Sequence, residues 1–407
     1  MRRFFCLTLL TGFSGLSIAQ GENTWLQKAD FGDLKRERAV SFSIGDYGYV
    51  GTGEDSMNVS KKDLWRYDPD ANSWSQMANL PGVERRNAVA FVIDEIGYVG
   101  TGIDSASSWV GTLLFDFWAY DPSSNSWTAK ANYPGGSGFG VYYAAAFSAG
   151  GKGYVTCGKM GSNWYASDLW EYDPTLDNWT PKAPFPAGVR YGLSALSIDD
   201  LGYVGFGIDQ DLYRRDWWQY NPTTNAWTAK SDLPGSERGT ASTFTIGQRG
   251  FIVLGANGSY IDELWQYNPF TDSWSIKSDF PGQGRRNGIA FSIGNKGYAG
   301  IGKGATGLKK TFYEYTPAGP VGLDENSKLS IQIYPNPVVE SALLFLQNNS
   351  DAAFYSVVDM AGRMLMTETI SGQSVEIRRN QLPAGTYVLA VTNKNGNLLA
   401  IEKLIFE

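Results

Sequence analysis

The sequence has no histidine and only two cysteines among its 407 residues. The absence of histidine excludes a Ser-His-Asp triad, a Cys-His pair and any metal site that depends on imidazole ligands. Two cysteines are also too few for a cysteine-rich metal site. We therefore predict neither a metal nor a cofactor, and any catalytic chemistry is left to carboxylates, tyrosines and arginines.

Positive charge is scarce as well. The chain has 34 Lys and Arg residues against 41 Asp and Glu residues, which gives a formal net charge of −7 at pH 7. A protein that binds nucleic acid needs a basic patch or stripe, and the sequence has no such stripe. Nucleic acid is therefore not an expected partner.

Long apolar runs are confined to the N-terminus. Residues 4–18 form an apolar stretch that follows two arginines and precedes small residues. This order is typical of a signal peptide, here over residues 1–19, with cleavage between Ala19 and Gln20. The stretch is too short for a membrane-spanning helix, and no later segment approaches the required length. We expect an exported chain without a membrane span.

The dominant pattern is a phrase that recurs with a period of about fifty residues. A typical copy begins with an acidic residue, continues through a Trp and a Tyr, and ends in Pro. The copies lie at 63–69, 116–122, 168–174, 216–222 and 263–269, with a divergent sixth copy at 311–317. Such a period, with short strands and Gly or Pro turns, predicts one supersecondary unit repeated around an axis.

Each unit is predicted to contain four strands. In the second unit we expect them at 88–93, 97–102, 116–120 and 126–130. The last unit lacks its fourth strand, but residues 25–31 match residues 274–280, which begin with the fourth-strand Trp of the fifth unit. The N-terminal strand should therefore complete the last sheet and remove an open edge. We predict an all-β, six-bladed β-propeller over residues 20–317, closed by the N-terminal strand.

The repeat resembles the kelch repeat, a β-propeller family. The shared features are the apolar first strand, the Tyr after the second turn, the glycines that end the second strand, the Tyr-Asp-Pro and the Trp beyond it. The resemblance covers Trp25 to about Pro317. One departure is that the glycine doublet of the family is here Gly-x-Gly, as in Gly51-Thr52-Gly53. The departure concerns kinship with particular kelch proteins and leaves the expected fold unchanged.

A different pattern follows the repeats. Residues 318–328 read as a linker, and residues 329–407 contain many short strands, as in a small Ig-like β-sandwich. This segment resembles the type A C-terminal sorting domain of the type IX secretion system. The resemblance is carried by Tyr334, Pro335, Asn336, Pro337, Asp359, Gly362, Arg363, Gly385 and Tyr387. It implies recognition by that secretion machinery and a secreted or outer-surface location, whereas an ordinary Ig-like accessory domain is the alternative.

One arginine recurs six positions before the first-strand apolar residue in five of the six units. These residues are Arg36, Arg85, Arg190, Arg238 and Arg285, and the third unit has Val141 at this place. In a propeller, the loops at this end of the strands share one face with the mouth of the central channel. We interpret the recurrent arginines as structural residues that bond blade to blade, or as a ring at the channel mouth.

Residues beside this ring and outside the repeat are the candidates for ligand binding. The first group is Arg38, Arg86, Arg286, Tyr142, Tyr143 and Tyr191, and the second, in the loops between the second and third strands, is Trp109, Trp164, Tyr165, Tyr213 and Tyr260. Guanidinium groups suit carboxylate, sulfate or phosphate. Aromatic side chains on exposed loops of a rigid scaffold suit sugar rings or a protein partner.

Three functions fit these residues. We expect a non-catalytic binding module for a glycan or an extracellular protein. The first alternative is a carbohydrate-active enzyme similar to the kelch-type sialic acid mutarotases. The resemblance implies a site built from Arg38, Arg86 and a carboxylate, Glu37 or Glu237, that serves as general base. The second alternative is a structural or adhesive surface component.

Overall fold

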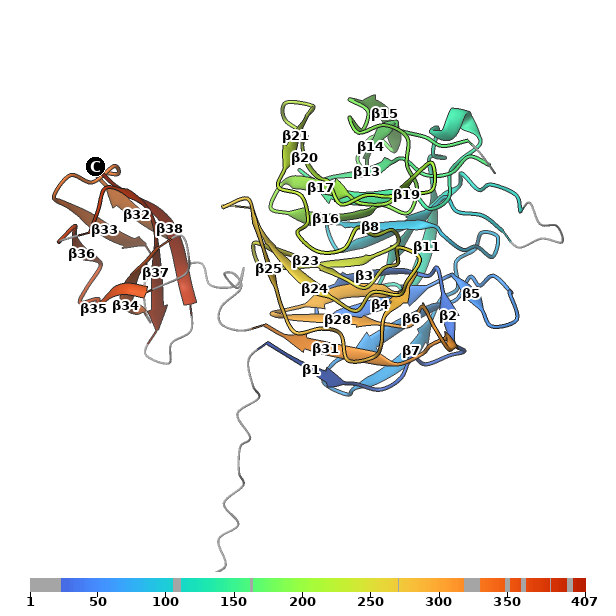
Figure 1. Cartoon of the computed structure of the whole chain (residues 1–407), viewed down its shortest axis with the longest axis horizontal. Helices are drawn as coiled ribbons and strands as arrows, with labels where there is room; N and C mark the ends of the chain where they lie inside the picture. Colours follow the sequence, from blue (N-terminus) through green and yellow to red (C-terminus); the bar gives the residue numbers. More distant parts are fainter. Residues whose placement is uncertain are drawn as a thin grey trace, which may run out of the picture.

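The computed structural model describes residues 23–104, 111–161, 164–269, 271–317, 330–347, 352–359, 364–380, 382–393 and 398–407. The expected signal peptide with its cleavage site, the linker, Trp109, Gly362 and Arg363 lie outside these ranges. Within them, every regular element is a β-strand except one short 3-10 turn, Gly136–Gly138 (Figure 1).

Six four-stranded antiparallel sheets, numbered here in chain order, form the described part of residues 23–317. Sheets 1 and 2 are β3 (Val40–Ile44), β4 (Tyr47–Gly51), β6 (Leu64–Asp68), β7 (Ser73–Met77) and β8 (Val89–Ile93), β9 (Ile96–Gly100), β10 (Phe117–Asp121), β11 (Ser126–Lys130). Sheets 3 and 4 are β12 (Ala145–Ala149), β13 (Lys152–Thr156), β14 (Leu169–Asp173), β15 (Asn178–Lys182) and β16 (Ser194–Ile198), β17 (Leu201–Gly205), β20 (Trp217–Asn221), β21 (Ala226–Lys230). Sheets 5 and 6 are β22 (Ser242–Ile246), β23 (Arg249–Val253), β24 (Leu264–Asn268), β25 (Ser273–Ile276) and β27 (Ile289–Ile293), β28 (Lys296–Gly300), β31 (Phe312–Thr316), β1 (Thr24–Gln27).

Neighbouring sheets pack through an aromatic residue on a glycine. Phe42 of β3 lies against Gly97 of β9, where an added Cβ would come within 2.6 Å of the Phe42 ring. Phe291 of sheet 6 lies against Gly48 of sheet 1 in the same way, with a corresponding separation of 2.1 Å. Because any side chain would collide with the ring, the Gly-Tyr pairs of the sequence mark the contacts between sheets.

The N-terminal strand belongs to the last sheet. β1 is hydrogen-bonded to β31, with Trp25 opposite Tyr315. The Trp25 indole donates to the Ser278 carbonyl at 2.9 Å, and its ring centroid lies 5.2 Å from that of Phe280. The first strands of the sheets contact one another in the order β3, β8, β12, β16, β22 and β27, and β27 contacts β3 again. The arrangement is propeller-like, and β1 lies beside the strand that the sequence predicts for it.

Six backbone hydrogen bonds form a ring just before the first strands. The members are Arg38, Asn87, Tyr143, Gly192, Thr240 and Asn287, and each amide donates to the carbonyl of the member in the preceding sheet at 2.7–3.3 Å. All six residues have a positive φ, between 51° and 65°. We call the end of the sheets that carries these bonds the ring face. A cavity of about 240 Å³ lies between the first strands, beside small residues such as Ala90, Ala146 and Ala195.

Short strand pairs extend the sheets on the ring face. They are β2 (Arg36–Glu37) with β5 (Glu54–Asp55), β18 (Ile208–Asp209) with β19 (Leu212–Tyr213), and β26 (Arg285–Arg286) with β29 (Lys303–Gly304) and β30 (Gly307–Leu308). Each lies in the loops that enter the first strand or leave the second. The short strands include Arg286 and Tyr213, and isolated β-bridges hold the backbone of five other candidates: Arg86, Tyr142, Tyr165, Tyr191 and Tyr260.

The C-terminal segment forms two further sheets. These are β32 (Ser330–Tyr334), β33 (Ser341–Gln347), β36 (Ser374–Arg378), and β35 (Met364–Thr369), β34 (Ala352–Val358), β37 (Gly385–Asn393), β38 (Leu398–Phe406). Leu344 and Ile377 of one sheet share a buried core with Val357, Leu389 and Leu404 of the other. Two sheets with a common core form the small sandwich that the strand pattern predicts.

Two motif residues of the C-terminal segment, Asn336 and Tyr387, form hydrogen bonds within the sandwich. The Asn336 side chain donates to the Lys403 carbonyl at 2.6 Å and accepts from the Ile405 amide at 2.9 Å. The Tyr387 hydroxyl donates to the Pro383 carbonyl at 2.9 Å. The Tyr-Pro-Asn-Pro segment therefore holds the last strand, β38, through its asparagine.

Candidate binding site on the ring face

The recurrent arginines are internal to the sheets. Arg36 is fully buried, and its guanidinium donates to the two Asp63 carboxylate oxygens at 2.7 and 2.8 Å and to the Thr52 carbonyl at 3.0 Å. Asp63 also accepts a hydrogen bond from the Trp65 indole at 2.8 Å. Three other sheets repeat this pair with Arg85 and Asp116, Arg190 and Asp216, and Arg238 and Glu263. Both side-chain partners belong to one sheet, whereas the backbone of these arginines bonds to the preceding sheet, as from the Arg85 amide to the Lys61 carbonyl at 2.9 Å. The interpretation that they bond blade to blade therefore holds for their backbone and is wrong for their side chains.

The pair has a simple topological cause. The arginine precedes the first strand and the acidic residue precedes the third strand, so both lie at the same end of the same sheet. Burial alone would raise the pKa of Asp63, but hydrogen bonds and charge interaction with Arg36 lower it below the usual range. The acidic residue and Trp that open the repeated phrase therefore hold a buried arginine. The guanidinium groups of these four arginines are therefore occupied by pairs within their own sheets.

Sheet 3 has lost the arginine of this pair. Val141 occupies its place, and the Asp168 carboxylate is held by the Trp170 indole at 2.8 Å and the Gly136 amide at 3.3 Å. Asp168 Oδ1 is buried and has no hydrogen-bond partner among the described residues. The Tyr133 hydroxyl is also buried without such a partner. Sheet 3 thus keeps the acceptors of the pair without their usual donor.

Sheet 6 has lost the carboxylate instead. Arg285 is fully buried and donates to Thr311 Oγ1 and to the Ile301 carbonyl, both at 3.1 Å. Burial lowers the pKa of Arg285 to about 10. No carboxylate forms an ion pair with it within the described ranges. The divergent sixth phrase therefore leaves a buried cation with a neutral partner.

One half of the central ring face is charged. Glu54 accepts from Arg38 at 3.2 Å and from Arg86 at 2.5 Å. Glu37 Oε2 lies 3.9 Å from both Arg38 Nε and Arg286 Nε. The two carboxylates are nearly buried, whereas Arg286 keeps 38% of its side chain exposed and is the most accessible of the three arginines. The three additional arginines are therefore brought together, as the sequence predicts, around two glutamates.

The other half is aromatic. Ring centroids are 5.7 Å apart for Tyr142 and Tyr143 and 6.1 Å apart for Tyr143 and Tyr191. Tyr165 stacks on Tyr191 at 5.4 Å with an interplanar angle of 10°. The Lys159 ammonium lies 4.2 Å from the Tyr191 ring centroid and 5.5 Å from that of Tyr165. Burial raises the pKa of Tyr191 to about 12 and lowers the pKa of Lys159, so both phenol and amine favour their neutral forms more than usual.

The two halves meet at Arg38 and Tyr143. The Arg38 guanidinium carbon lies 6.0 Å from the Tyr143 ring centroid, within the range of a cation–π contact. Both residues also belong to the ring of backbone hydrogen bonds. A ligand on this surface would meet cationic donors on one side and aromatic faces on the other. That combination recognises an anionic group attached to a flat, partly apolar body.

Sequence reasoning missed Glu54 and Lys159. Each follows the glycine two residues beyond the end of a second strand, and each pairs with a residue that precedes a first strand: Glu54 faces Glu37, and Lys159 faces Tyr142. The aligned positions in sheets 2, 4 and 5 carry Ile103, Ile208 and Ala256, and sheet 6 carries Lys303, which faces Arg286. An alignment of the six units on their second strands would have shown that charged residues occupy this position in only some of the units.

The remaining loop candidates are scattered. Trp164 is 73% exposed. Tyr213 lies near the backbone of sheet 5, with its Cε1 3.5 Å from an added Cβ on Gly239, and it lines a cavity of sheets 4 and 5. Tyr260 makes no aromatic ring contact among the described residues. Sequence reasoning also missed Phe139, a loop residue that is 69% exposed.

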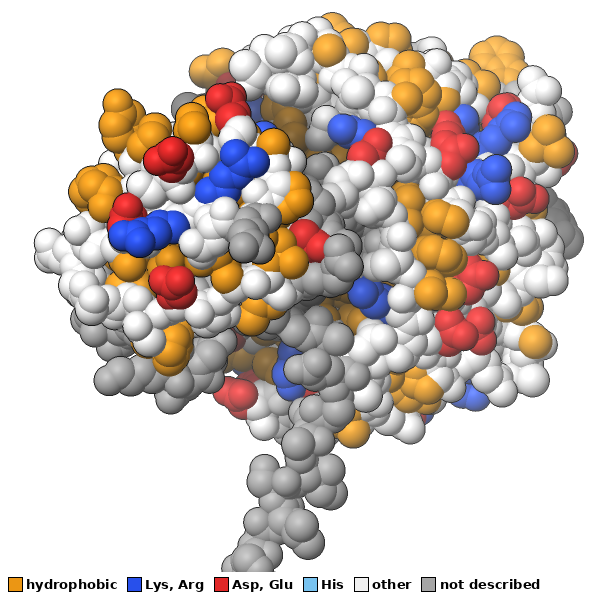
Figure 2. All heavy atoms as spheres, turned by 60° about the vertical axis from the view of Figure 1, so that its left-hand side comes forward, with side chains coloured by type: hydrophobic (Ala, Val, Ile, Leu, Met, Phe, Trp, Pro, Cys, Tyr) orange, Lys and Arg blue, Asp and Glu red, His pale blue; other side chains and the backbone are white. Residues whose placement is uncertain are grey.

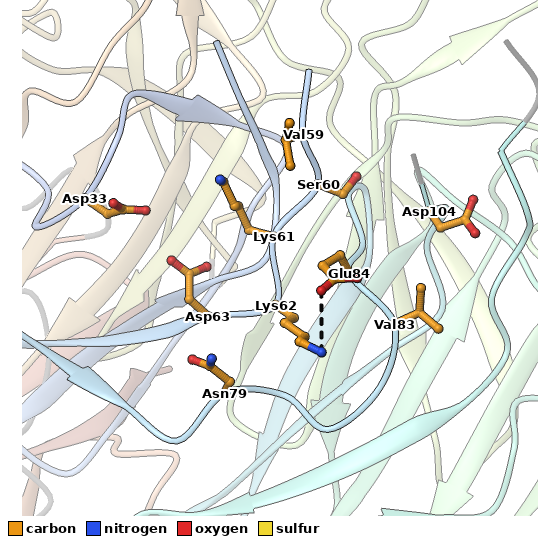
Figure 3. A pocket seen from close by; sticks show the side chains of 10 residues that line it. All are labelled: Asp33, Val59, Ser60, Lys61, Lys62, Asp63, Asn79, Val83, Glu84 and Asp104. Atoms are coloured by element: carbon orange, nitrogen blue, oxygen red, sulfur yellow. Dashed lines mark ion pairs between the residues drawn. The ribbon is translucent and has the colours of Figure 1, made fainter. Parts of the chain in front are cut away.

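The two cavities at the edge of the ring face are not lined by the three additional arginines or by the tyrosines of the aromatic half. Figure 3 shows one of about 600 Å³ between sheets 1 and 2, crossed by an ion pair of 3.4 Å between Lys62 and Glu84. Lys61, at its wall, pairs with Asp55 at 2.7 Å. Glu237 lines a separate cavity of about 440 Å³ in sheets 4 and 5. Of the two carboxylates considered for catalysis, the structure brings only Glu37 to Arg38 and Arg286.

A metal site, a membrane-spanning helix or a patch of surface charge would also point to a function. No group of three or more His, Cys, Asp or Glu side chains there is arranged to hold a metal ion. Within the same ranges, no helix is long and apolar enough to cross a membrane. On the surface drawn in Figure 2, Lys and Arg side chains are dispersed among Asp and Glu.

Comparison with known proteins identifies the C-terminal segment. Residues 332–407 match the family described as the secretion system C-terminal sorting domain, which confirms the predicted type IX sorting domain and indicates export to the cell surface or the medium. No curated protein matches the chain. A solved structure titled "Structure of YjhT" aligns with a TM-score of 0.58 and 18% identity, over 70% of this chain and 96% of that one. At this identity the likeness concerns the fold alone, and it agrees with the propeller-like arrangement.

Proposed function

We propose that this chain is an exported, six-bladed kelch-type propeller that binds a glycan carrying an anionic group, without chemical conversion, on its ring face. The six four-stranded sheets, the cyclic contacts of their first strands and the pairing of β1 with β31 support the blade number and the closure. The repeated phrase and its Trp support membership of the kelch type.

The observation that carries the binding function is the two-sided composition of the central ring face. Arg286 and Arg86 offer guanidinium donors to a carboxylate or sulfate. Tyr191 and Tyr165 offer aromatic faces to a sugar ring. The groups sit on a rigid backbone ring, so little conformational entropy is lost when a ligand binds.

Glycan-array binding of the full chain, followed by titration calorimetry, tests this function. We expect uronate, sialylated or sulfated glycans to bind and the Arg286→Ala variant to lose about tenfold or more in affinity. Arg215→Ala is the matched control, because Arg215 is exposed but lies at the cavity of sheets 4 and 5. Equal binding of charged and neutral glycans, or equal losses in both variants, would contradict the proposal.

Catalysis on an acidic sugar, as in the kelch-type sialic acid mutarotases, is the second candidate. Glu37 favours it, because this nearly buried carboxylate accepts from Asn287 Nδ2 at 2.7 Å and lies beside two arginines. A carboxylate so placed could move a proton at a sugar hydroxyl. NMR exchange between anomers of free sialic acid would detect the reaction. Acceleration that Glu37→Gln abolishes while binding persists would favour the enzyme.

Export rests on the sorting domain. We expect that removing residues 332–407 leaves the chain inside the cell envelope, because the secretion machinery no longer recognises it. Fractionation of a Bacteroidota host that expresses both forms measures this directly. Appearance of the truncated chain in the medium would show that another segment directs export.

A further inference from the structure

We propose that the ligand is an oligosaccharide, which extends from the centre of the ring face to its rim over sheet 3. This inference rests on the proposed glycan-binding function and adds the length and direction of the ligand. Its basis is a set of aromatic and apolar side chains on neighbouring loops, which we call the path: Tyr191, Tyr165, Met160, Trp164, Phe139 and Phe115.

The inner part of the path runs through one hairpin loop between β13 and β14. Tyr142 and Lys159 exchange both backbone hydrogen bonds, at 3.0 and 2.7 Å, which ties the start of this loop to the tyrosine half. Lys159 is bridged in turn to Tyr165, whose ring stacks on Tyr191. The Met160 amide donates to the Trp164 carbonyl at 2.8 Å and closes the hairpin. Trp164, which is 73% exposed, therefore lies in the same hairpin as Tyr165, its neighbour in sequence.

The outer part of the path runs through the glycine-rich loop that precedes β12. A Cβ on Gly136 would lie 3.4 Å from Met160 Cγ, so this loop packs on the hairpin. A Cβ on Gly140 would lie 3.2 Å from Phe115 Cβ, so the other end of the loop lies against sheet 2. Between these contacts Phe139 is 69% exposed, and Phe115 is 42% exposed.

Equivalent loops elsewhere on the ring face are different. The loop between β23 and β24 carries Asn257, Gly258 and Ser259, and that of sheet 6 is a tight turn ending at Gly307–Leu308. Sheet 1 exposes Met57 and Val59, but these residues flank the cavity of Figure 3, which is lined by paired charges. Compared with the described loops of sheets 1, 5 and 6, the loops of sheet 3 therefore carry more exposed aromatic residues beside the central site.

Sugar rings fit such a path better than isolated ions or small acids do. Beyond Lys159 the named side chains carry no charge, so they offer faces for stacking and no partner for an anion. Exposed aromatic residues that continue a binding site extend its contact with a long ligand. Successive units of one glycan chain could cover Tyr191 at the centre and Trp164 farther out. A monosaccharide at the centre would leave Trp164 and Phe139 uncovered.

The experiment compares two oligosaccharide ladders by titration calorimetry on the full chain. One ladder is galacturonic acid as monomer, trimer and hexamer, and the other is glucose in the same lengths as cello-oligosaccharides. We expect affinity for the galacturonate hexamer to exceed that for the monomer by about tenfold or more, and Trp164→Ala to remove this gain without weakening monomer binding. Leu176→Ala, another exposed hydrophobic residue in sheet 3, but at the opposite end, is the control.

The two proposals fail in different ways. Equal affinity for monomer and hexamer, or a length gain that Trp164→Ala preserves, would overturn the extended site while leaving anion binding intact. A length gain in both ladders with no preference for galacturonate would support the path and overturn the role of the arginines. Absence of binding to every member of both ladders would overturn the extended site, because the stacking surface should hold long chains of either kind.

Discussion

Sheets 3 and 6 each lack one half of the arginine–carboxylate pair that the other four sheets share. Sheet 6 keeps Arg285 and has Thr311 in place of the acid, whereas sheet 3 keeps Asp168 and has Val141 in place of the arginine. The two losses have different surroundings. In sheet 6 the loops remain short, while in sheet 3 the glycine-rich loop donates a backbone amide to the orphaned carboxylate and exposes Phe139.

The two sheets differ in how far the loss of one partner changes the surrounding structure. A neutral partner for Arg285 changes only the interior of sheet 6. Loss of the arginine in sheet 3 accompanies a rebuilt surface, because the loop that would carry the arginine now reaches Asp168 through Gly136. The same sheet contributes most of the aromatic half of the site. The sheet that has lost the arginine of the structural pair is therefore also the sheet that provides most of the aromatic part of the proposed binding surface.

Acid should produce the largest effect, because several pairs are lost together. Burial would raise the pKa of Asp63, Asp116 and Glu263, but hydrogen bonds from the paired arginine and the neighbouring Trp lower it overall. Ionised carboxylates therefore stabilise the fold above about pH 4, and this stabilisation is lost as the pH falls through their folded-state pKa values. Calorimetry should show Tm falling steeply from about pH 5 to pH 3. A Tm that stays level over this range would contradict the role of the pairs.

Breaking one complete pair should have the next largest effect. We expect Arg85→Met to cost about 3–5 kcal/mol, because the change leaves the Asp116 carboxylate without its cation. In a domain of this size the loss lowers Tm by on the order of 10 °C. Arg286→Met is the control, since this arginine is partly exposed and forms only a contact of 3.9 Å with Glu37. Similar losses for both variants would remove the distinction between structural and site arginines.

Neutralising the acidic residue should lower the stability of the fold more in sheet 2 than in sheet 3. Asp116→Asn removes the charge opposite Arg85 and should cost about 2 kcal/mol. Asp168→Asn removes a charge that has no arginine partner, so its effect should be below about 1 kcal/mol and of either sign. Chemical denaturation of the two variants measures the contrast. Equal costs would mean that Asp168 has a cationic partner in solution.

Restoring the acid in sheet 6 should have the smallest effect. Thr311→Asp places a carboxylate where the other sheets have one, within reach of Arg285. We expect stabilisation of about 1 kcal/mol, and a smaller effect for the uncharged control Thr311→Asn. The gain should shrink as the pH falls below about 4, because the new carboxylate becomes protonated, first in the unfolded chain and then in the folded one. An increase in Tm that is the same for Asp and Asn would attribute the change to packing.

Much of the repeat architecture could be predicted because it is local and repeated. The Gly-Tyr pairs and the Tyr-Asp-Pro turns recur at a fixed spacing, and Trp25 matches Trp274. Because the pattern is repeated, a wrong assignment in one unit does not change the predicted fold. The pairing of β1 with β31 followed from that match. The recurrent arginine was also visible, although its partner within the same sheet was not, because two strands and a loop of variable length separate the two residues in the chain, as between Arg36 and Asp63.

The site could be predicted only in part. Arg38, Arg86 and Arg286 were recognised as departures from the repeat, and the structure brings them together. Glu54 and Lys159 were missed because the residues at this position vary from unit to unit, from Glu54 through Ile103 to Lys303, and show no repeated pattern. Phe139 was missed because a glycine-rich loop gives no periodic signal, and its exposure depends on the packing of Gly136 and Gly140 against neighbouring loops.

The circle of backbone bonds from Arg38 through Asn287 has a consequence for amide exchange. A ladder between two strands frays from its last bond, whereas a closed circle has no last bond. Exchange of any of the six amide protons with deuterium should therefore require the sheets to separate, and the six should exchange together and slowly despite lying at a surface. The backbone beneath a ligand on the ring face would therefore be rigid. Adaptation to different ligands would come from the side chains and from the loops at the rim.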